Sequence, residues 1–315
     1  MSKYIRVVVL LVMLISNQAL AKEKEHYQKI LDAAKEIKIN LVLGDCIILL
    51  SPDKKIHLDV VHTYDDLNVR IIYRGKTLKI EEKLNRNDCK GTGEWTIRIP
   101  AGTELEFESA TGGLEIQDIN LVVEGNTGTG AIRLNNVKGE FELHTGTGRI
   151  ELNDSDGEFK LHSGTGSVLV SNSRGLFDLQ SGTGRVRVER CHGDFGCHSG
   201  TGKVIADDPY IVEEGEFSSG TGEVRVTKPQ GSFVQLQLSS GTNNAVLDLA
   251  GQPVTGCFKM SANERRGRIV CPLKFDKTER FENGDGYYIV KSMMKGKDTP
   301  VYEISTGVGT AELKP

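Results

Sequence analysis

A four-residue peptide recurs at regular intervals along this chain and constrains its fold more than any other feature. The peptide reads Ser or Thr, Gly, Thr, Gly, as in residues 145–148. The threonines of its copies, the first of which has Ala110 and the last Asn243 in place of a Gly, stand at positions 111, 129, 147, 165, 183, 201, 221 and 242. The first five intervals are therefore 18 residues each, and the last two are 20 and 21 residues. Equal spacing of this kind indicates one structural unit that is repeated in series.

Each 18-residue unit contains two short stretches in which apolar and polar residues alternate. Gly157, Phe159 and Leu161 precede one copy of the peptide, and Val168 and Val170 follow it. Alternation with a period of two is typical of a β-strand with one buried face. Each unit is therefore predicted to form two strands, separated by glycine-rich turns.

A unit of two short strands cannot bury its own apolar side chains, but a stack of such units can. Stacking places each residue over the one 18 positions earlier, ~4.8 Å away. The phenylalanines of successive units then form one internal ladder: Phe141, Phe159, Phe177 and Phe195. We therefore predict an all-β fold, a β-solenoid resembling a parallel β-helix, built from 18-residue two-strand coils. A meander of antiparallel hairpins is the alternative, but it does not require equal intervals at every position.

Two other repeat architectures fit this sequence poorly. Hexapeptide β-helices need an apolar residue at every sixth position, whereas Lys138 and His144 follow Ile132 at those steps. Calcium-binding nonapeptide repeats need a regular Asp among their glycines, and Thr occupies that position here. No calcium ladder is therefore expected.

The repeat divides the chain into six predicted segments. Residues 1–21 read as a signal peptide, 22–36 as an N-terminal capping segment, and 37–108 as irregular β coils. Residues 109–263 are the regular solenoid, 264–300 an inserted loop or hairpin, and 301–315 a final coil. The capping segment is predicted to be a short amphipathic helix, because Tyr27, Ile30, Leu31 and Ala34 have helix-like spacing and solenoid ends need caps.

The N-terminus has the three parts of a secretory signal peptide. Lys3 and Arg6 give a positive start, residues 7–15 form a short apolar run, and the sequence Ala-Leu-Ala at 19–21 matches a cleavage site. The apolar run is shorter than the ~20 residues that span a bilayer. We therefore expect an exported protein (periplasmic, on the cell surface or secreted) with no transmembrane segment in the mature chain.

Six cysteines lie in the expected mature chain: Cys46, Cys89, Cys191, Cys197, Cys257 and Cys271. An even number in an oxidising compartment favours disulfide bonds, although six cysteines allow 15 connectivities. Pairing neighbours in sequence gives Cys46–Cys89, Cys191–Cys197 and Cys257–Cys271. This choice rests on proximity in sequence alone.

The repeat resembles a known bacterial family of exported β-strand-repeat proteins, named "putative adhesins", whose function is unknown. Their repeats carry Ser/Thr-Gly-Ser/Thr-Gly followed by x-Ile/Val-x-Val, and residues 99–116 also resemble that family's entry into its repeats. The resemblance covers roughly residues 37–315. It implies a solenoid fold and a periplasmic or surface location, and it transfers no site residues.

Charge and motifs exclude some functions. With 39 Lys and Arg against 43 Asp and Glu, the net charge of −4 lacks the basic excess of nucleic-acid binders. No nucleophile elbow, P-loop or His-Glu-x-x-His sequence occurs, and no cofactor is expected. Solenoids can carry polysaccharide lyases or hydrolases with paired carboxylates. Glu140, Glu142 and Glu151, however, are mixed with basic residues at outward positions, as in solvated charge ladders.

Histidines recur at one position of the repeat. His144, His162 and His198 occupy equivalent places, with Gln180 between the last two, so stacking predicts a row of imidazoles along one edge. His192 and two cysteines stand nearby in sequence, which makes these four histidines weak candidates for metal ligands. Surface histidines without a metal are the commoner case, and such a row could instead respond to pH.

The sequence therefore favours an exported, non-enzymatic β-solenoid that acts as an adhesin-like or structural interaction protein. Its elongated surface is expected to contact a protein or glycan partner. A carbohydrate-active enzyme on the same fold is the alternative. A more remote one is an ice-binding protein that uses the threonine ladder, although glycine on both sides of Thr in the regular copies favours a corner over a flat face.

Overall fold

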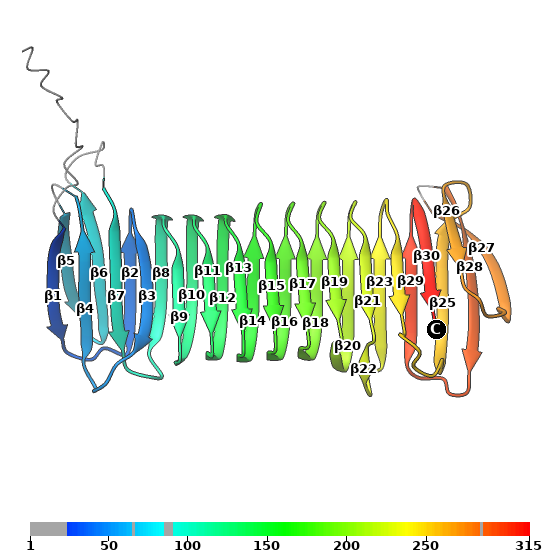
Figure 1. Ribbon diagram of the computed structural model, residues 1–315, viewed down its shortest axis with the longest axis horizontal. Helices are drawn as coiled ribbons and strands as arrows, with labels where there is room; N and C mark the ends of the chain where they lie inside the picture. The colour runs from blue at the N-terminus through cyan, green and yellow to red at the C-terminus, as the bar shows by residue number, and fades with distance from the viewer. Residues whose placement is uncertain (1–23, 65–66, 85–90, 284–285) are drawn as a thin grey trace, which may run out of the picture.

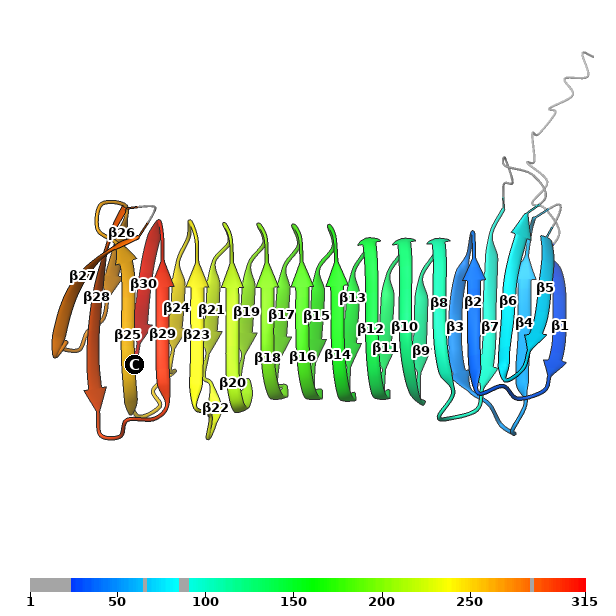
Figure 2. The ribbon, with the colours of Figure 1, turned by 180° about the vertical axis from the view of Figure 1, so that it is seen from behind.

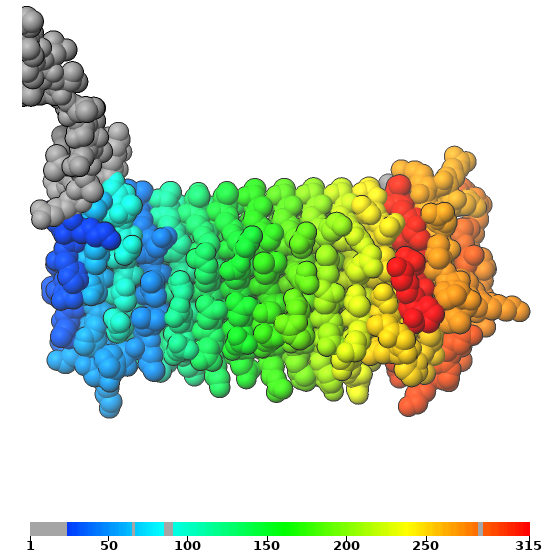
Figure 3. Space-filling view, in the orientation of Figure 1, coloured from blue at the N-terminus to red at the C-terminus, as the bar shows by residue number. Residues whose placement is uncertain are grey.

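The computed structural model describes residues 24–64, 67–84, 91–283 and 286–315, so the predicted signal peptide at 1–21 lies outside the described part. These residues form two long sheets that face each other along an elongated body (Figures 1 and 2). The space-filling view shows the successive coils as parallel ridges across this body (Figure 3). Among the described residues there is no helix that is long and apolar enough to cross a membrane.

Within the described residues, sheet A has 14 strands. In spatial order they are β1 (Glu25–Leu31), β4 (Ile56–His62), β7 (Gly93–Ile99), β3 (Asp45–Leu50), β9 (Leu114–Gln117), β11 (Ile132–Asn135), β13 (Ile150–Asn153), β15 (Val168–Ser171), β17 (Val186–Glu189), β19 (Val204–Asp207), β21 (Val224–Thr227), β24 (Ala245–Asp248), β30 (Gly309–Lys314) and β26 (Gly267–Val270).

Sheet B has 16 strands in the part of the chain that the structure describes. In spatial order they are β27 (Lys277–Asn283), β28 (Gly286–Lys295), β25 (Gly256–Asn263), β29 (Val301–Thr306), β23 (Gln235–Ser240), β20 (Tyr210–Ser219), β18 (His192–Ser199), β16 (Arg174–Ser181), β14 (Asp156–Ser163), β12 (Lys138–Thr147), β10 (Asn120–Thr129), β8 (Glu104–Thr111), β2 (Glu36–Leu41), β6 (Thr77–Leu84) and β5 (Leu67–Arg74), with β22 (Gln230–Gly231) beside β20.

From β8 to β24 the chain alternates between the two sheets, and each strand pairs in parallel with the strand one unit away. Phe141 pairs with Phe159 in sheet B, and Ile150 pairs with Val168 in sheet A, both at the interval of 18. The predicted parallel stacking of 18-residue, two-strand units is therefore confirmed, and the antiparallel meander is wrong for this region. The 20-residue interval has a local cause, because an irregularity in the β18–β20 pairing shifts the register from 18 to 20 between Gly193 and Phe195. The 21-residue interval appears in the next coil, where β20 pairs with β22 at a register of 20 and with β23 at a register of 21.

Apolar side chains from both sheets meet in one continuous core. The rings of Phe141, Phe159, Phe177 and Phe195 stack with centroids 5.5, 5.7 and 5.2 Å apart, and each is at most 3% exposed. The branched side chains of sheet A, such as Val168 and Val186, are buried opposite them. The ladder forms because parallel pairing repeats the same side chain on the same face at every step.

A second ladder explains the small residues of the repeat peptide. The Ser or Thr that begins each copy is buried, and from Thr127 to Ser240 its hydroxyl connects two coils. Ser181 Oγ donates to the backbone oxygen of Gly166 at 2.8 Å and accepts from the nitrogen of Gly184 at 2.8 Å. Because buried backbone groups need partners, this hydroxyl satisfies a carbonyl and an amide that the turn removes from the strand ladder.

The N-terminal segment differs from the prediction. Residues 22–36 were expected to contain a capping helix, but β1 and the start of β2 lie there, and β1 pairs antiparallel with β4. Leu31 is buried opposite Ile56, whereas Ile30 is 61% exposed. The strand satisfies backbone groups of β4 that a helix over the coil end would leave unpaired, so tertiary pairing overrides the local spacing of apolar residues.

At both ends, strands are out of sequence order. The coil of β29 and β30 pairs with β23 and β24 on one side and with β25 and β26 on the other. Residues 301–315 do return to the repeat register, but they lie inside the stack, and β25 to β28 form its end. The segment predicted as an inserted loop or hairpin contains the β27–β28 hairpin, which extends sheet B.

Glu82 is a buried carboxylate near the N-terminal end. It is 2% exposed and accepts hydrogen bonds from the backbone nitrogens of Val42 and Leu43 at 2.5 and 2.8 Å. Burial raises the pKa of Glu82 above its ordinary value of 4.5, and the two backbone donors offset this only in part. The protonated acid is therefore favoured by folding.

This pKa predicts a pH dependence of stability. A raised pKa in the folded state contributes stability at pH values below about 4.5, and that contribution is lost as the pH rises through the folded-state pKa. We expect Glu82→Gln to gain on the order of 1 kcal/mol relative to wild type between pH 4 and pH 7. Urea unfolding at several pH values measures the difference in unfolding free energy between wild type and variant. Glu94→Gln, a change at an exposed residue, is the control. A wild-type-to-variant difference that is constant over this range would contradict the assignment.

Candidate functional site

The outer face of sheet B is strongly acidic. Strands β8, β10, β12, β14, β16, β18 and β20 carry acidic residues that all remain accessible: Glu104, Glu106, Glu108, Glu124, Glu140, Glu142, Asp156, Glu158, Asp178, Asp194, Glu213, Glu214 and Glu216. The basic residues of the same strands are Lys138, Lys160 and Arg174. Parallel pairing places Glu106, Glu124 and Glu142 side by side in one column, in which Lys38 of β2 makes an ion pair with Glu106 at one end and Lys160 follows Glu142 at the other. Like charges on neighbouring strands repel, so this face is poised to attract positive charge.

The outer face of sheet A has a different electrostatic character. Three arginines of its regular coils have acidic neighbours within ion-pair distance. Arg187 lies 3.0 Å from Asp207, and Arg133 lies 3.6 Å from Glu151. Arg225 is paired with Glu223 of the preceding turn. Charge on this face is therefore largely compensated within the protein.

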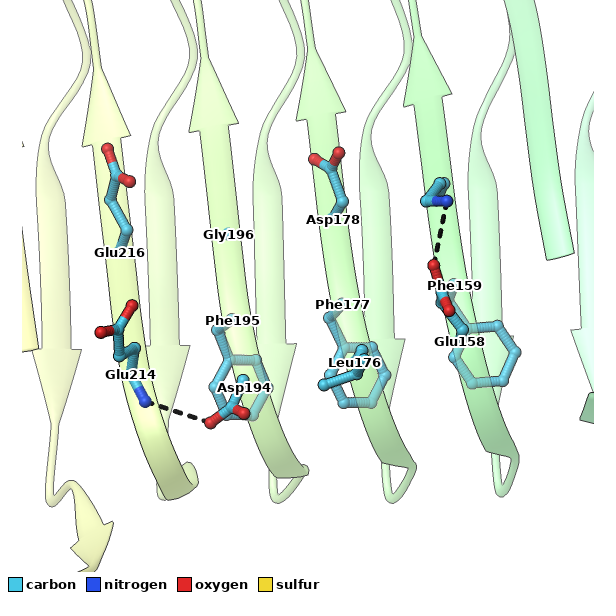
Figure 4. Close-up of a pocket in the computed structure, with 11 residues that line it drawn as sticks. Glu158, Phe159, Leu176, Phe177, Asp178, Asp194, Phe195, Gly196, Glu214 and Glu216 are labelled. Atoms are coloured by element: carbon cyan, nitrogen blue, oxygen red, sulfur yellow. Dashed lines mark hydrogen bonds and ion pairs between the residues drawn. The ribbon is translucent and has the colours of Figure 1, made fainter. Parts of the chain in front are cut away.

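A hollow of about 320 Å³ interrupts the acidic face at Gly196 (Figure 4). Asp178 and Glu216 stand on the neighbouring strands in the column of Gly196, which itself contributes no side chain. Asp194 precedes Gly196 on β18 itself, and Glu214 precedes Glu216 on β20, each on the same face as the residue it precedes (Figure 4). Four carboxylates thus surround a space that a side chain would otherwise fill.

Asp194 also shapes the hollow. Its Oδ1 accepts hydrogen bonds from the backbone nitrogens of Glu213 and Glu214 at 2.7 and 3.1 Å. These two residues belong to the irregular part of β20, where the register shifts from 18 to 20. The carboxylate therefore fixes the extra residues of this coil and the direction of its neighbouring acidic side chains.

Lys160 is the basic residue at the border of the hollow. Its Nζ lies 2.9 Å from Glu158 Oε1. The hydrogen bond and charge of Glu158, together with Glu142 and Asp178, raise the pKa of Lys160, so its ammonium group stays protonated. One ammonium group cannot neutralise the carboxylates around it.

The predicted histidine row exists. His144 pairs with His162, His162 with Gln180, and Gln180 with His198, so these side chains form a row on the outer face of sheet B. The rings of His144 and His162 meet edge to face at 5.5 Å, and His198 Nδ1 lies 2.6 Å from Ser218 Oγ.

His192 lies apart from this row, at the opposite end of β18. Its ring stacks on Tyr210 with the centroids 4.4 Å apart. Within the described residues, no group of three or more His, Cys, Asp or Glu side chains is arranged to hold a metal ion. The histidines are therefore brought together as a polar row rather than as a chelating cluster.

The predicted disulfides Cys191–Cys197 and Cys257–Cys271 are not formed. The third predicted pair, Cys46–Cys89, includes a cysteine that lies outside the described residues. Cys46, Cys191, Cys197, Cys257 and Cys271 are free thiols. Strand β18 separates Cys191 from Cys197, and an extended chain moves residues apart by about 3.3 Å per position. Cys257 alternates with the buried Phe258 and so faces outward, whereas Cys271 packs against the core. Proximity in sequence is a poor guide here because strands separate neighbours and alternate their faces.

The buried thiols have low reactivity. Burial raises the pKa of the Cys191 thiol to about 11 and also raises the pKa values of the Cys46 and Cys197 thiols. The thiolate is the reactive form, so these three groups act as small apolar side chains in the core.

The repeat threonines form one exposed column at the edge of the stack, as the corner interpretation predicts. Thr183 Oγ1 approaches the backbone oxygen of Thr165 at 3.4 Å, and Thr201 repeats this contact at 3.5 Å. The column is flanked by glycines and followed by charged residues such as Arg185 and Lys203. It is a single column on a turn rather than a broad flat face.

The sequence interpretation missed two features of this face. The hollow at Gly196 has a sequence signal, because Gly replaces the Glu, Lys or Asp that its column carries in the other coils. A cleft at the C-terminal end of sheet B has no such signal, because residues as far apart as Gln237, Phe281 and Glu303 line it.

No known family model matches the chain, and no curated protein matches it. Solved structures do show similarity. A "putative cell adhesion protein" from Clostridium sporogenes is 16% identical, with 93% of this chain and 99% of that chain covered and a TM-score of 0.29. A "putative adhesin" from Parabacteroides distasonis is 12% identical, with coverages of 92% and 97% and a TM-score of 0.30. A "putative lipid binding protein" from the same species is 15% identical, with coverages of 93% and 96% and a TM-score of 0.33. At these scores and identities, the similarities establish neither a common function nor membership of a family.

Proposed function

We propose that this chain is an exported, non-enzymatic β-solenoid that acts as an adhesin-like or structural interaction protein. The observation that carries the proposal is the acidic outer face of sheet B, which runs along the regular coils and contains the hollow at Gly196. The N-terminal sequence pattern supports export. The partner is expected to be a protein or glycan that brings positive charge or hydrogen-bond donors to this face.

The charge asymmetry between the two sheets supports binding through sheet B. Carboxylates on neighbouring coils repel one another, and a cationic partner would relieve this repulsion on binding. Sheet A compensates its own charges and gains less from such a partner. Stacked repeats also hold the acidic side chains in fixed columns, which suits an extended binding surface.

Matched charge-neutralised variants test the proposal. One variant changes Asp178 and Asp194 to Asn and Glu214 and Glu216 to Gln. The control changes four acidic residues of sheet A, Glu151, Glu189, Asp207 and Glu312, to their amides. Crosslinking of the tagged, full-length chain in its host cells identifies the partner, and its affinity for each variant is then measured. We expect at least tenfold weaker binding for the sheet B variant and less than threefold for the control.

Equal loss in both variants, or no loss in either, would place the binding surface elsewhere. Cell fractionation of the tagged chain tests export in the same experiment. Retention of the whole protein in the cytoplasm would contradict the proposal as a whole.

The grouping of four carboxylates at the hollow keeps a carbohydrate-active enzyme as the second candidate. Paired carboxylates serve glycoside hydrolysis as acid and as base or nucleophile. Incubation with a polysaccharide panel separates the two functions. Turnover by wild type that is abolished in the sheet B amide variant would replace the interaction protein with an enzyme.

A further inference from the structure

We propose that a cleft at the C-terminal end of sheet B binds an uncharged oligosaccharide. The cleft has a volume of about 400 Å³, in the range of small-ligand sites. Strands β23, β25, β27, β28 and β29 line it, so residues far apart in sequence meet there. The inference rests on the proposed function in one respect: it assigns a glycan, among the possible partners, to a second site on the same face.

Phe281 supplies the apolar surface that a sugar ring needs. One side of its ring stacks on Tyr288 with the centroids 5.5 Å apart, and the residue remains 44% exposed. Val290, from the neighbouring strand, also lines the cleft. The C–H groups of a pyranose ring pack on an aromatic face, while its hydroxyls remain free for hydrogen bonds.

Neutral polar groups stand across the cleft from Phe281. Gln237 and Ser261 line it, and neither side chain makes a hydrogen bond within the described residues. Ser305 lies between their strands, and its hydroxyl makes only a long contact of 3.4 Å to the backbone oxygen of Leu238. An amide and two hydroxyls can each donate and accept, as sugar hydroxyls require.

The charged residues around the cleft are already paired. Lys259 Nζ lies 3.1 Å from Glu303, and Lys277 Nζ lies 2.8 Å from Glu279. Because these ion pairs compensate one another, the cleft has no excess charge to attract an anion or a cation. This distinguishes it from the acidic hollow at Gly196 and favours a neutral ligand.

Arg280 makes the wall of the cleft that carries Phe281 rigid. Its Nη2 lies 2.8 Å from Glu264 Oε2, its Nε lies 3.1 Å from Oε1, and the guanidinium covers the Tyr287 ring at 3.7 Å. These contacts join β27 to β28 and to the β25–β26 turn. A wall held in this way loses little conformational freedom when a ligand binds.

The hydroxyls of the cleft also continue the histidine row. Ser261 pairs with Ser305, Ser305 with Ser239, Ser239 with Ser218, and Ser218 with His198. Neutral hydrogen-bonding groups therefore extend from the cleft across successive strands at steps of ~4.8 Å. An oligosaccharide lying across the strands meets a polar group at every step.

Calorimetric titration of the full mature chain tests this assignment, with cellohexaose, maltohexaose and xylohexaose as probes. At least one of them is expected to bind with one-to-one stoichiometry. Phe281→Ala should weaken that binding at least tenfold, Phe281→Tyr should stay within threefold, and Gln237→Ala should weaken it three- to tenfold. Leu176→Ala, an exposed apolar residue elsewhere on the same face, is the control and should leave the affinity unchanged.

No binding of any hexaose at 10 mM would overturn the proposal, as would binding that is unchanged in Phe281→Ala and Gln237→Ala. Selective binding of a sulfated oligosaccharide would also overturn it, because the cleft has no excess positive charge. Gln237→Ala provides a second test of the cleft in case Phe281→Ala does not fold. Thermal melting shows whether each of the two variants is folded. The sheet B amide variant leaves the cleft intact, so failure of this site and failure of the proposed function are separable.

Discussion

Replacement of Gly166 by alanine is expected to destabilise the protein by at least about 4 kcal/mol. A β-carbon at this position would lie 1.7 Å from the backbone oxygen of Gly148 in the preceding coil. The obstacle is backbone in the next layer, so no side-chain rotation relieves it, and the two coils must separate. Separation would also break the hydroxyl ladder, because Ser181 donates to the Gly166 oxygen and Ser163 to the Gly148 oxygen.

Gly196 provides the matched control. A β-carbon there meets no atom closer than 3.7 Å, so alanine fits without movement. We expect Gly196→Ala to change the unfolding free energy by no more than about 1 kcal/mol, in either direction. Urea unfolding followed by circular dichroism measures both variants. Near-equal stabilities would mean that the coils are not stacked as closely as the structure places them.

Truncation of one ring in the phenylalanine ladder has the second largest expected effect. Phe177→Ala should cost about 3–5 kcal/mol, because it removes a ring that is 3% exposed and stacked between Phe159 and Phe195. Its neighbour Leu176 points to the other face and is 52% exposed, so Leu176→Ala should cost no more than about 0.5 kcal/mol.

Hydrogen exchange adds a spatial test of the same ladder. Because each coil contacts mainly its two neighbours, Phe177→Ala should accelerate exchange first in β14, β16 and β18. Uniform acceleration over the whole chain would instead indicate one global unfolding unit. Equal destabilisation by the Phe177 and Leu176 variants would contradict the assignment of the two faces.

The regular part of the fold could be predicted because one physical constraint repeats there. Phe141, Phe159 and Phe177 recur at 18 residues, and parallel pairing of identical units is the arrangement that buries all of them. The histidine row followed from the same spacing. The two disulfide pairs that lie within the described residues did not, since, for example, Cys257 faces outward from β25 whereas Cys271, which follows β26, packs against the core.

The ends of the stack depend on interactions that local patterns do not contain. Residues 22–36 have apolar side chains at helix-like spacing, yet Glu25–Leu31 form a strand because β4 offers them an unpaired edge. The coil of β29 and β30 lies between two pairs of strands that precede it in sequence, β23 with β24 and β25 with β26. The β27–β28 hairpin then completes the cleft around Phe281. Both outcomes depend on which edges are free once the other strands have paired.

The sequence by itself determined the unit of this protein: its length, its two strands, its buried phenylalanine and its tight glycine turn. It did so because backbone hydrogen bonding and side-chain alternation are local properties that recur with the repeat. Tertiary structure alone decided where the stack ends, how its last coil is inserted and which distant side chains share a cleft. Those features arise from pairing between segments far apart in sequence, and the free energy of such pairing depends on every other strand that competes for the same edge.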